Sequence, residues 1–145
     1  MGRPILLFTG PWADLSATWR MIHLAWTVPA AVAVYVFGSV ARGSAGPRSD
    51  VDVAVLMEEV PSATLMGPQL SIEGRLEQAL GRPVDLIILN GASADLVHRV
   101  LRDGELVLER DRGRRVRFEV ARRNEYFDLQ PVRDAYRRMT ARRPA

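Results

Sequence analysis

The amino-acid sequence predicts an α/β (α+β) fold in one domain that spans residues 1–145, and three observations support this class. Apolar runs at Val32–Phe37 and Val84–Leu89 have the length of buried strands. Residues 50–55 alternate valine with aspartate or alanine, which is the pattern of a strand with one face in the core. The longer segments around these runs carry apolar side chains at helical spacing and end at glycine or proline. This arrangement predicts a central sheet flanked by helices.

Helical spacing and boundary residues predict five helices, and a short alternating run predicts an edge strand at residues 105–109. The expected helices are residues 14–27, 68–80, 95–102, 112–127 and a last helix that Pro131 opens. The side chains expected to face inward from the second and last helices are Leu70, Leu76, Leu80, Val132, Ala135, Tyr136 and Met139. Residues 1–11 are expected to form a loose N-terminal arm, and residues 110–145 a basic helical C-terminal part.

The composition limits the chemistry that this chain can perform. There are no cysteines, which excludes disulfides and thiolate metal ligands. All 20 basic residues are arginine, so no lysine can act as a nucleophile or a phosphate anchor, and arginine must do any cationic work. No apolar run has the length of a membrane span or of the apolar part of a signal peptide. A cytoplasmic protein with no membrane partner is therefore expected.

The stretch from Val34 to Leu56 contains the candidate site residues. Gly38 and Ser39 close the first apolar strand, where backbone N–H groups and a hydroxyl can face phosphate oxygens. Asp50 and Asp52 are two residues apart, so in a strand both side chains leave the same face. Two carboxylates that project together repel each other unless a cation lies between them, and Mg2+ prefers such oxygen ligands. The stretch therefore predicts a site for a nucleoside triphosphate and a metal ion.

The arginine-rich C-terminal part admits three interpretations: a solvated helical surface, a patch for an acidic partner, or a patch for a nucleic-acid backbone. Aromatic side chains that stack on bases are sparse in this part, which makes a nucleic acid an unlikely direct substrate. The apolar side chains of Trp12, Trp19 and Trp26 fit either a core or an interface. The sequence therefore leaves open whether the chain forms homo- or hetero-oligomers.

Gly38-Ser39, followed after ten residues by Asp50-Val51-Asp52, resembles the signature of polymerase-beta-type nucleotidyltransferases. The fuller run from Tyr35 to Leu56 most resembles the minimal nucleotidyltransferases, which are the antitoxin partners of HEPN-domain toxins in prokaryotic toxin–antitoxin pairs. The resemblance extends to Asp85 on a following strand, and it covers most of the chain after Ala31. Residues 1–11 match nothing in the family pattern.

The resemblance implies a polymerase-beta-like fold, with a mixed central sheet, and a role for each candidate residue. Asp50 and Asp52 would hold two Mg2+ ions, and Asp85 would complete one metal site and help to deprotonate the attacking hydroxyl. Gly38 and Ser39 would contact the triphosphate of ATP. The predicted nucleotide-binding set also includes Arg42 and Ser49. Arg42 is placed either to touch a phosphate or to pair with a nearby acid, and Ser49 is also placed to fix the loop by hydrogen bonding to the backbone.

Three functions follow from the resemblance and stay open at this point. In the first, the protein transfers AMP from ATP to a hydroxyl, expected to be a tyrosine, of a HEPN ribonuclease toxin and so silences it. In the second, it neutralises the toxin by contact alone, with a vestigial nucleotide pocket. In the third, it modifies a small molecule. The three carboxylates, all present, favour the first function, and the short chain argues against a dedicated small-molecule domain.

Overall fold

The four strands of the computed structural model form one mixed sheet, in the order β3–β2–β1–β4. The model describes residues 28–46, 48–59 and 66–141. The strands are β1 (Ala31–Phe37), β2 (Val51–Met57), β3 (Val84–Ile88) and β4 (Glu105–Glu109). β1 pairs antiparallel with β2 and β4, while β2 and β3 run parallel. The predicted mixed sheet is therefore confirmed, and β4 lies at its edge as expected.

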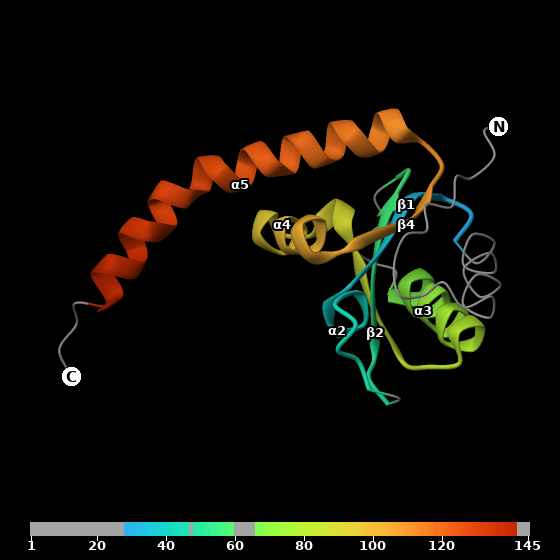
Figure 1. The fold of residues 1–145 in the computed structure, drawn as a ribbon. Helices are drawn as coiled ribbons and strands as arrows, with labels where there is room; N and C mark the ends of the chain where they lie inside the picture. Colours follow the sequence, from blue (N-terminus) through green and yellow to red (C-terminus); the bar gives the residue numbers. More distant parts are fainter. Residues whose placement is uncertain (1–27, 47, 60–65, 142–145) are drawn as a thin grey trace.

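Helices lie on both sides of this sheet (Figure 1). They are α2 (Gly38–Ala41), α3 (Met66–Leu80), the 3-10 turn η1 (Leu89–Gly91), α4 (Ala94–Asp103) and α5 (Arg112–Ala141). None of the helices in the described parts of the chain is long and apolar enough to cross a membrane. The helix predicted at residues 14–27 and the arm predicted at residues 1–11 lie outside the described residues.

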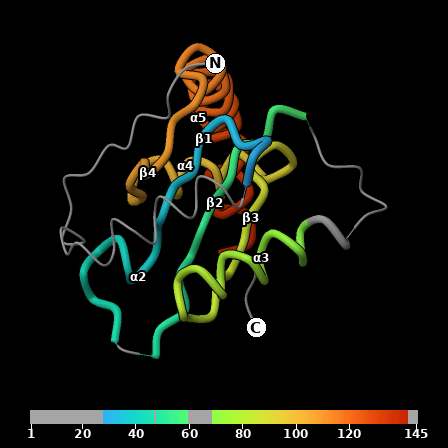
Figure 2. Tube along the Cα trace, turned by 90° about the vertical axis from the view of Figure 1, so that its right-hand side faces the viewer, coloured from blue at the N-terminus to red at the C-terminus, as the bar shows by residue number. Residues whose placement is uncertain are grey.

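The core consists of one apolar cluster on each face of the sheet, and β1 contributes to both. All seven residues of β1 are buried, as expected for a central strand. Val34 and Val36 pack with Leu76 of α3 on one face. Tyr35 and Phe37 belong to the cluster on the other face, with α4. Alternate residues of one strand therefore hold α3 and α4 on opposite sides of the sheet (Figure 2).

The 30-residue helix α5 corrects the prediction of two helices separated at Pro131, because α5 is continuous from Arg112 to Ala141 and Pro131 lies inside it. A proline within a helix removes one N–H donor from the preceding turn. The Arg133 guanidinium donates a hydrogen bond to the carbonyl of Tyr126, at 2.8 Å, and so supplies a side-chain donor to that turn. The ribbon of α5 bends along its length and runs out beyond the sheet (Figure 1).

Several side chains expected to face inward are exposed instead. Val132, Tyr136 and Met139 are 66%, 68% and 73% exposed, and Ala135 is also exposed. Their helical spacing is real, but this part of α5 extends past the sheet and packs on none of the strands. Leu70 of α3 is likewise exposed, whereas Leu76 is fully buried. Periodicity thus identified an apolar stripe without indicating what covers it.

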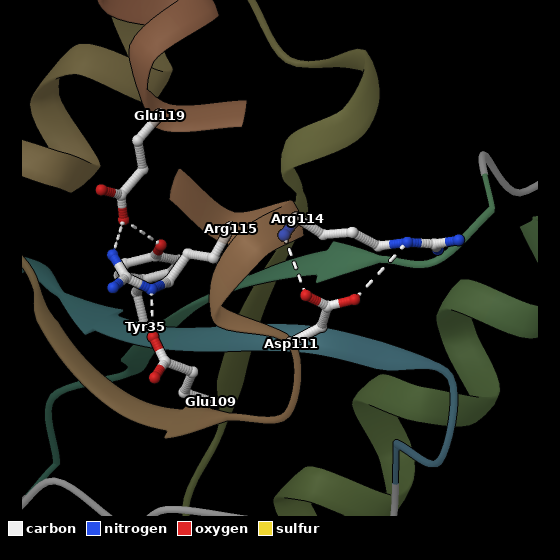
Figure 3. A network of polar contacts seen from close by, with 6 residues as sticks. All are labelled: Tyr35, Glu109, Asp111, Arg114, Arg115 and Glu119. Carbon is white, nitrogen blue, oxygen red and sulfur yellow. Dashed lines mark hydrogen bonds and ion pairs between the residues drawn. The ribbon is translucent and has the colours of Figure 1, made fainter. Parts of the chain in front are cut away.

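A polar network anchors the first turns of α5 to the sheet (Figure 3). The Tyr35 hydroxyl donates to a Glu119 carboxylate oxygen at 2.7 Å. Arg115 donates to the same Glu119 oxygen at 2.6 Å and pairs with Glu109 of β4. Glu109 is only 6% exposed, so its charge depends on Arg115. Burial, and then the Glu119 carboxylate, raise the pKa of Tyr35 well above its ordinary value.

Removing Arg115 should therefore destabilise the fold far more than removing an exposed arginine of the same turn. Arg115→Ala leaves the buried Glu109 carboxylate unpaired, with an expected cost of about 3–5 kcal/mol in the free energy of unfolding. Arg114→Ala is the matched control, because Arg114 pairs with Asp111 at the surface, and it should cost less than about 1 kcal/mol. Urea denaturation of both variants measures the difference. Equal losses would show that Glu109 does not depend on its partner.

Candidate functional site

Strand register brings two of the three predicted carboxylates side by side at one end of the sheet. Asp52 in β2 is the cross-strand partner of Asp85 in β3. On its other side, Asp52 lies opposite Phe37, the last residue of β1. Asp50 immediately precedes β2. The candidate site therefore forms where β1 ends and where β2 and β3 begin.

Two features of the backbone at the end of β1 favour a glycine at position 38. Its φ angle is +70°, a backbone conformation that favours glycine. A Cβ atom at Gly38 would lie 2.0 Å from the Asp52 Oδ2 atom. The turn from β1 into α2 therefore passes directly against the Asp52 carboxylate. Ser39 follows in α2 and is half-buried.

The three carboxylates are close enough to influence one another. Partial burial raises the pKa of Asp52 above its ordinary value, and the Asp85 and Asp50 carboxylates raise it further, while Arg42 lowers it. Asp50 and Asp85 are exposed, and Asp52 is half-buried. The site is therefore a region of concentrated negative charge that opens to solvent. A cation would relieve this repulsion.

The donor set fits Mg2+, which takes carboxylate oxygens as ligands. In the parts of the chain that the structure describes, however, no three acidic, histidine or cysteine side chains already enclose a metal position. The carboxylates thus supply suitable donors in adjacent strands without forming a closed cage. This geometry suits an ion that arrives with further oxygen ligands, such as those of a triphosphate.

Arg42 and Ser49 border this region, and the loop between them closes on itself. Arg42 is exposed and makes no ion pair within the described residues; it influences Asp52 through its charge. The Ser49 hydroxyl accepts a hydrogen bond from the Gly46 N–H at 2.9 Å. The expectation that Ser49 fixes the loop is therefore confirmed, whereas its contact with a nucleotide stays a prediction.

Sequence reasoning missed Arg82, whose guanidinium reaches the loop that precedes Asp50. It donates to the carbonyl oxygens of Gly46 and Ser49 at 2.8 and 2.7 Å. An arginine that follows a helix-ending glycine carries no sequence signal for a contact more than 30 residues away. Only the pairing of β2 with β3 shows that it lies beside the site.

A groove of about 250 Å3 lies elsewhere, between α4 and α5. Ser93, Asp95, Leu129 and Val132 are among the residues that line it. Arg133 also lines it and pairs with Asp95. None of the predicted nucleotide or metal residues contributes to this groove, so it is separate from the carboxylate region.

Comparisons of the sequence and of the structure with known proteins both find nucleotidyltransferases or toxin–antitoxin proteins. A protein adenylyltransferase, MntA, of Thermococcus cleftensis is 40% identical over 68 residues, which are 47% of this chain and 66% of the relative. This chain thus spans slightly less than two thirds of that relative's length. Among solved structures, a toxin–antitoxin with AMP-PNP is 27% identical, with a TM-score of 0.71, over 84% of this chain and 96% of the other. The structure of a minimal nucleotidyltransferase is 33% identical, with a TM-score of 0.51, over 65% of this chain and 93% of the other.

The family model described as polymerase beta, nucleotidyltransferase matches residues 21–113. This range contains Gly38, Ser39 and all three candidate carboxylates. It covers well over half of the chain, and the solved relatives repeat the fold. The predicted resemblance is confirmed: the chain belongs to the polymerase beta nucleotidyltransferase family.

Proposed function

We propose that this protein is an antitoxin that uses Mg2+ and ATP to transfer AMP to a tyrosine hydroxyl of a cognate HEPN ribonuclease toxin. The observation that carries the proposal is the register that pairs Asp52 with Asp85, with Gly38 packed against Asp52. The name of the Thermococcus relative, an adenylyltransferase, supports AMP transfer. The AMP-PNP complex of a related toxin–antitoxin supports ATP as the nucleotide.

Each site residue has a role that its position supports. Asp50 and Asp52 would hold Mg2+, and Asp85 would complete one metal site from the next strand. Bound Mg2+ supplies positive charge to the entering and leaving oxygens of nucleotidyl transfer. The backbone N–H groups of Gly38 and Ser39, at the start of α2, lack acceptors within the helix and are free to bind phosphate oxygens.

The exposed groups complete the reaction. Asp85, whose side chain is open to solvent, accepts the proton of the incoming tyrosine hydroxyl. The tyrosine oxygen then forms a bond to the α-phosphorus of ATP, and the bond from that phosphorus to pyrophosphate breaks, so pyrophosphate leaves. Arg42 faces the same negative region, and once a triphosphate is bound its guanidinium pairs with a phosphate oxygen. Ser49 supports the nucleotide site by holding the loop between Arg42 and Asp50. Little covalent work remains for the protein, so positioning and electrostatics provide the catalysis.

The protein partner is supported by α5. Val132, Tyr136 and Met139 are large, exposed and regularly spaced on a helix that extends past the sheet. Exposed apolar patches are a feature of surfaces that bind other proteins. Solved relatives that align with 84% of this chain are toxin–antitoxin structures. The toxin therefore docks on the C-terminal half of α5 and presents its tyrosine to the carboxylates.

The first prediction separates catalysis from contact. Asp50→Asn together with Asp52→Asn should reduce transfer of labelled AMP to a co-expressed HEPN toxin to background, because the metal loses two of its ligands. Autoradiography of the co-expressed toxin measures this, and mass spectrometry should find added AMP on a tyrosine. Glu59→Gln, at an exposed position beyond the end of β2 that is remote from Asp50, is the control. If the double variant protects cells from the toxin as fully as the wild type does, neutralisation occurs by contact.

The second prediction follows from the raised pKa of Asp52. The unfolded chain loses this proton near the ordinary aspartate pKa of 3.8, before the folded chain does, so stability falls as pH rises through the raised value. Asp52→Asn should therefore unfold at a higher temperature than the wild type at pH 7 without metal. The difference should disappear as the pH falls to 3.8. Mg2+ with AMP-PNP should stabilise the wild type selectively; a wild type that is more stable than the variant without metal would contradict this.

The third prediction tests the docking surface. Val132→Asp with Tyr136→Asp should abolish co-purification of the toxin, because two charges would enter an apolar contact. Binding of Mg2+ and AMP-PNP should not change, since both positions lie outside the carboxylate region. Leu70→Asp is the control, because Leu70 is 60% exposed on α3 and far from α5 in the fold. Retention of the toxin by the double variant would place the docking surface elsewhere.

A further inference from the structure

The Arg82 side chain crosses from one connection to another. Arg82 lies between Gly81, which follows α3 with φ +65°, and Pro83, which precedes β3. Its guanidinium Nη2 atom donates to the carbonyl oxygens of Gly46 and Ser49, at 2.8 and 2.7 Å. These acceptors belong to the loop that leads into β2. One nitrogen atom therefore holds two carbonyl groups of the same turn.

Arg82 and Pro83 together hold both peptide groups that join Asp50 to the chain. On the N-terminal side of Asp50, the Ser49 carbonyl accepts from Arg82. On the C-terminal side, the Val51 N–H donates to the Pro83 carbonyl at 2.9 Å. The carboxylate of Asp50 is exposed and has no ion pair among the described residues. Its direction is therefore set by its backbone, and its backbone is held by this dipeptide.

The rest of the turn strengthens this restraint. The Ser49 N–H donates to the Gly46 carbonyl at 3.1 Å, and the Gly46 N–H donates to the Ser49 hydroxyl at 2.9 Å. Arg82 thus donates to two residues, Gly46 and Ser49, that are already hydrogen-bonded to each other next to Asp50. Two residues after Pro83, Asp85 pairs with Asp52 across the strands. The segment from Arg82 to Asp85 therefore connects all three carboxylates.

The burial of the Arg82 guanidinium is energetically unfavourable, and a contact that only joined two loops would not require it. Arg82 is half-buried and makes no ion pair with an acid in the described part of the chain, and its Nε atom is buried without a hydrogen-bond partner there. A buried cationic donor without a full set of partners is unfavourable. A lysine at this position would place a compact ammonium group near the two carbonyls, without the planar fork that arginine provides.

We propose that Arg82 is a positioning residue that holds Asp50 in the direction needed for metal binding. This inference rests on the proposed function, because it assumes that Asp50 is a metal ligand. Arg82 touches neither nucleotide nor metal. It acts through the carbonyl groups of Gly46 and Ser49 on the Asp50 backbone.

Calorimetric titration of the full chain with Mn2+·AMP-PNP tests this role. Arg82→Met removes both donated hydrogen bonds and should raise the dissociation constant about 10- to 100-fold, as is usual for residues that orient metal ligands. The number of sites per folded chain should not change. Arg82→Lys, which keeps a charged donor, should give an intermediate constant. Arg75→Met is the matched control, because Arg75 is exposed on the preceding helix and should leave the constant unchanged.

A second titration, with AMP-PNP and EDTA, distinguishes positioning from general support of the fold. Metal-free binding should be the same for the wild type and all three variants. One outcome is that Arg82→Met or Arg82→Lys lowers the unfolding temperature or the number of sites but leaves the dissociation constant unchanged. Arg82 is then structural, and the inference fails while the proposed function stands. Equal weakening with and without metal also overturns the inference. A wild type that binds no Mn2+·AMP-PNP overturns both.

Discussion

Repulsion among Asp50, Asp52 and Asp85 is the constraint on which this end of the sheet depends. The pairing of β2 with β3 places Asp52 beside Asp85, and the entry into β2 places Asp50 next to them. Burial and the two neighbouring carboxylates together raise the pKa of Asp52. A fold selected only for stability would gain by replacing one of these acids. Their joint presence, with a glycine that leaves space for the Asp52 carboxylate, is what a cation-dependent site requires.

Burial of β1 and hydrogen-bonded networks elsewhere in the sheet stabilise the fold against this repulsion. β1 is buried along its whole length, and it lies between β2 and the edge strand β4. The Tyr35–Glu119–Arg115–Glu109 network fastens β1 and β4 to α5. At the site itself, Arg82 and Pro83 fasten the Asp50 backbone to the start of β3. The charged groups therefore project from rigid elements, which is the condition for preorganised electrostatic catalysis.

Much of the fold and the identity of the candidate carboxylates could be predicted from the sequence, because both follow from local patterns. Alternation at residues 50–55 indicates β2, and the Gly38-Ser39 pair indicates the turn after β1. The C-terminal part shows the limit of such patterns. Helical spacing is the same for an apolar stripe that packs on a sheet and for one that does not, so it predicts inward side chains at Val132 and Tyr136, which are exposed. Pro131 indicated a break, but α5 continues through it as a bent helix (Figure 1), because a proline can bend a helix as well as break it. Arg82 was beyond prediction because its contacts join segments that only the sheet brings together.

The central claim is that the three carboxylates together hold the metal ions that bind a nucleotide. Crystals grown with Mn2+ and AMP-PNP, measured for anomalous scattering of manganese, test it most directly. The account predicts an anomalous peak within bonding distance of carboxylate oxygens of Asp50 and Asp52, with Asp85 beside it and the triphosphate next to Gly38 and Ser39. A peak elsewhere in the molecule, or a nucleotide bound in the groove between α4 and α5, would contradict the account.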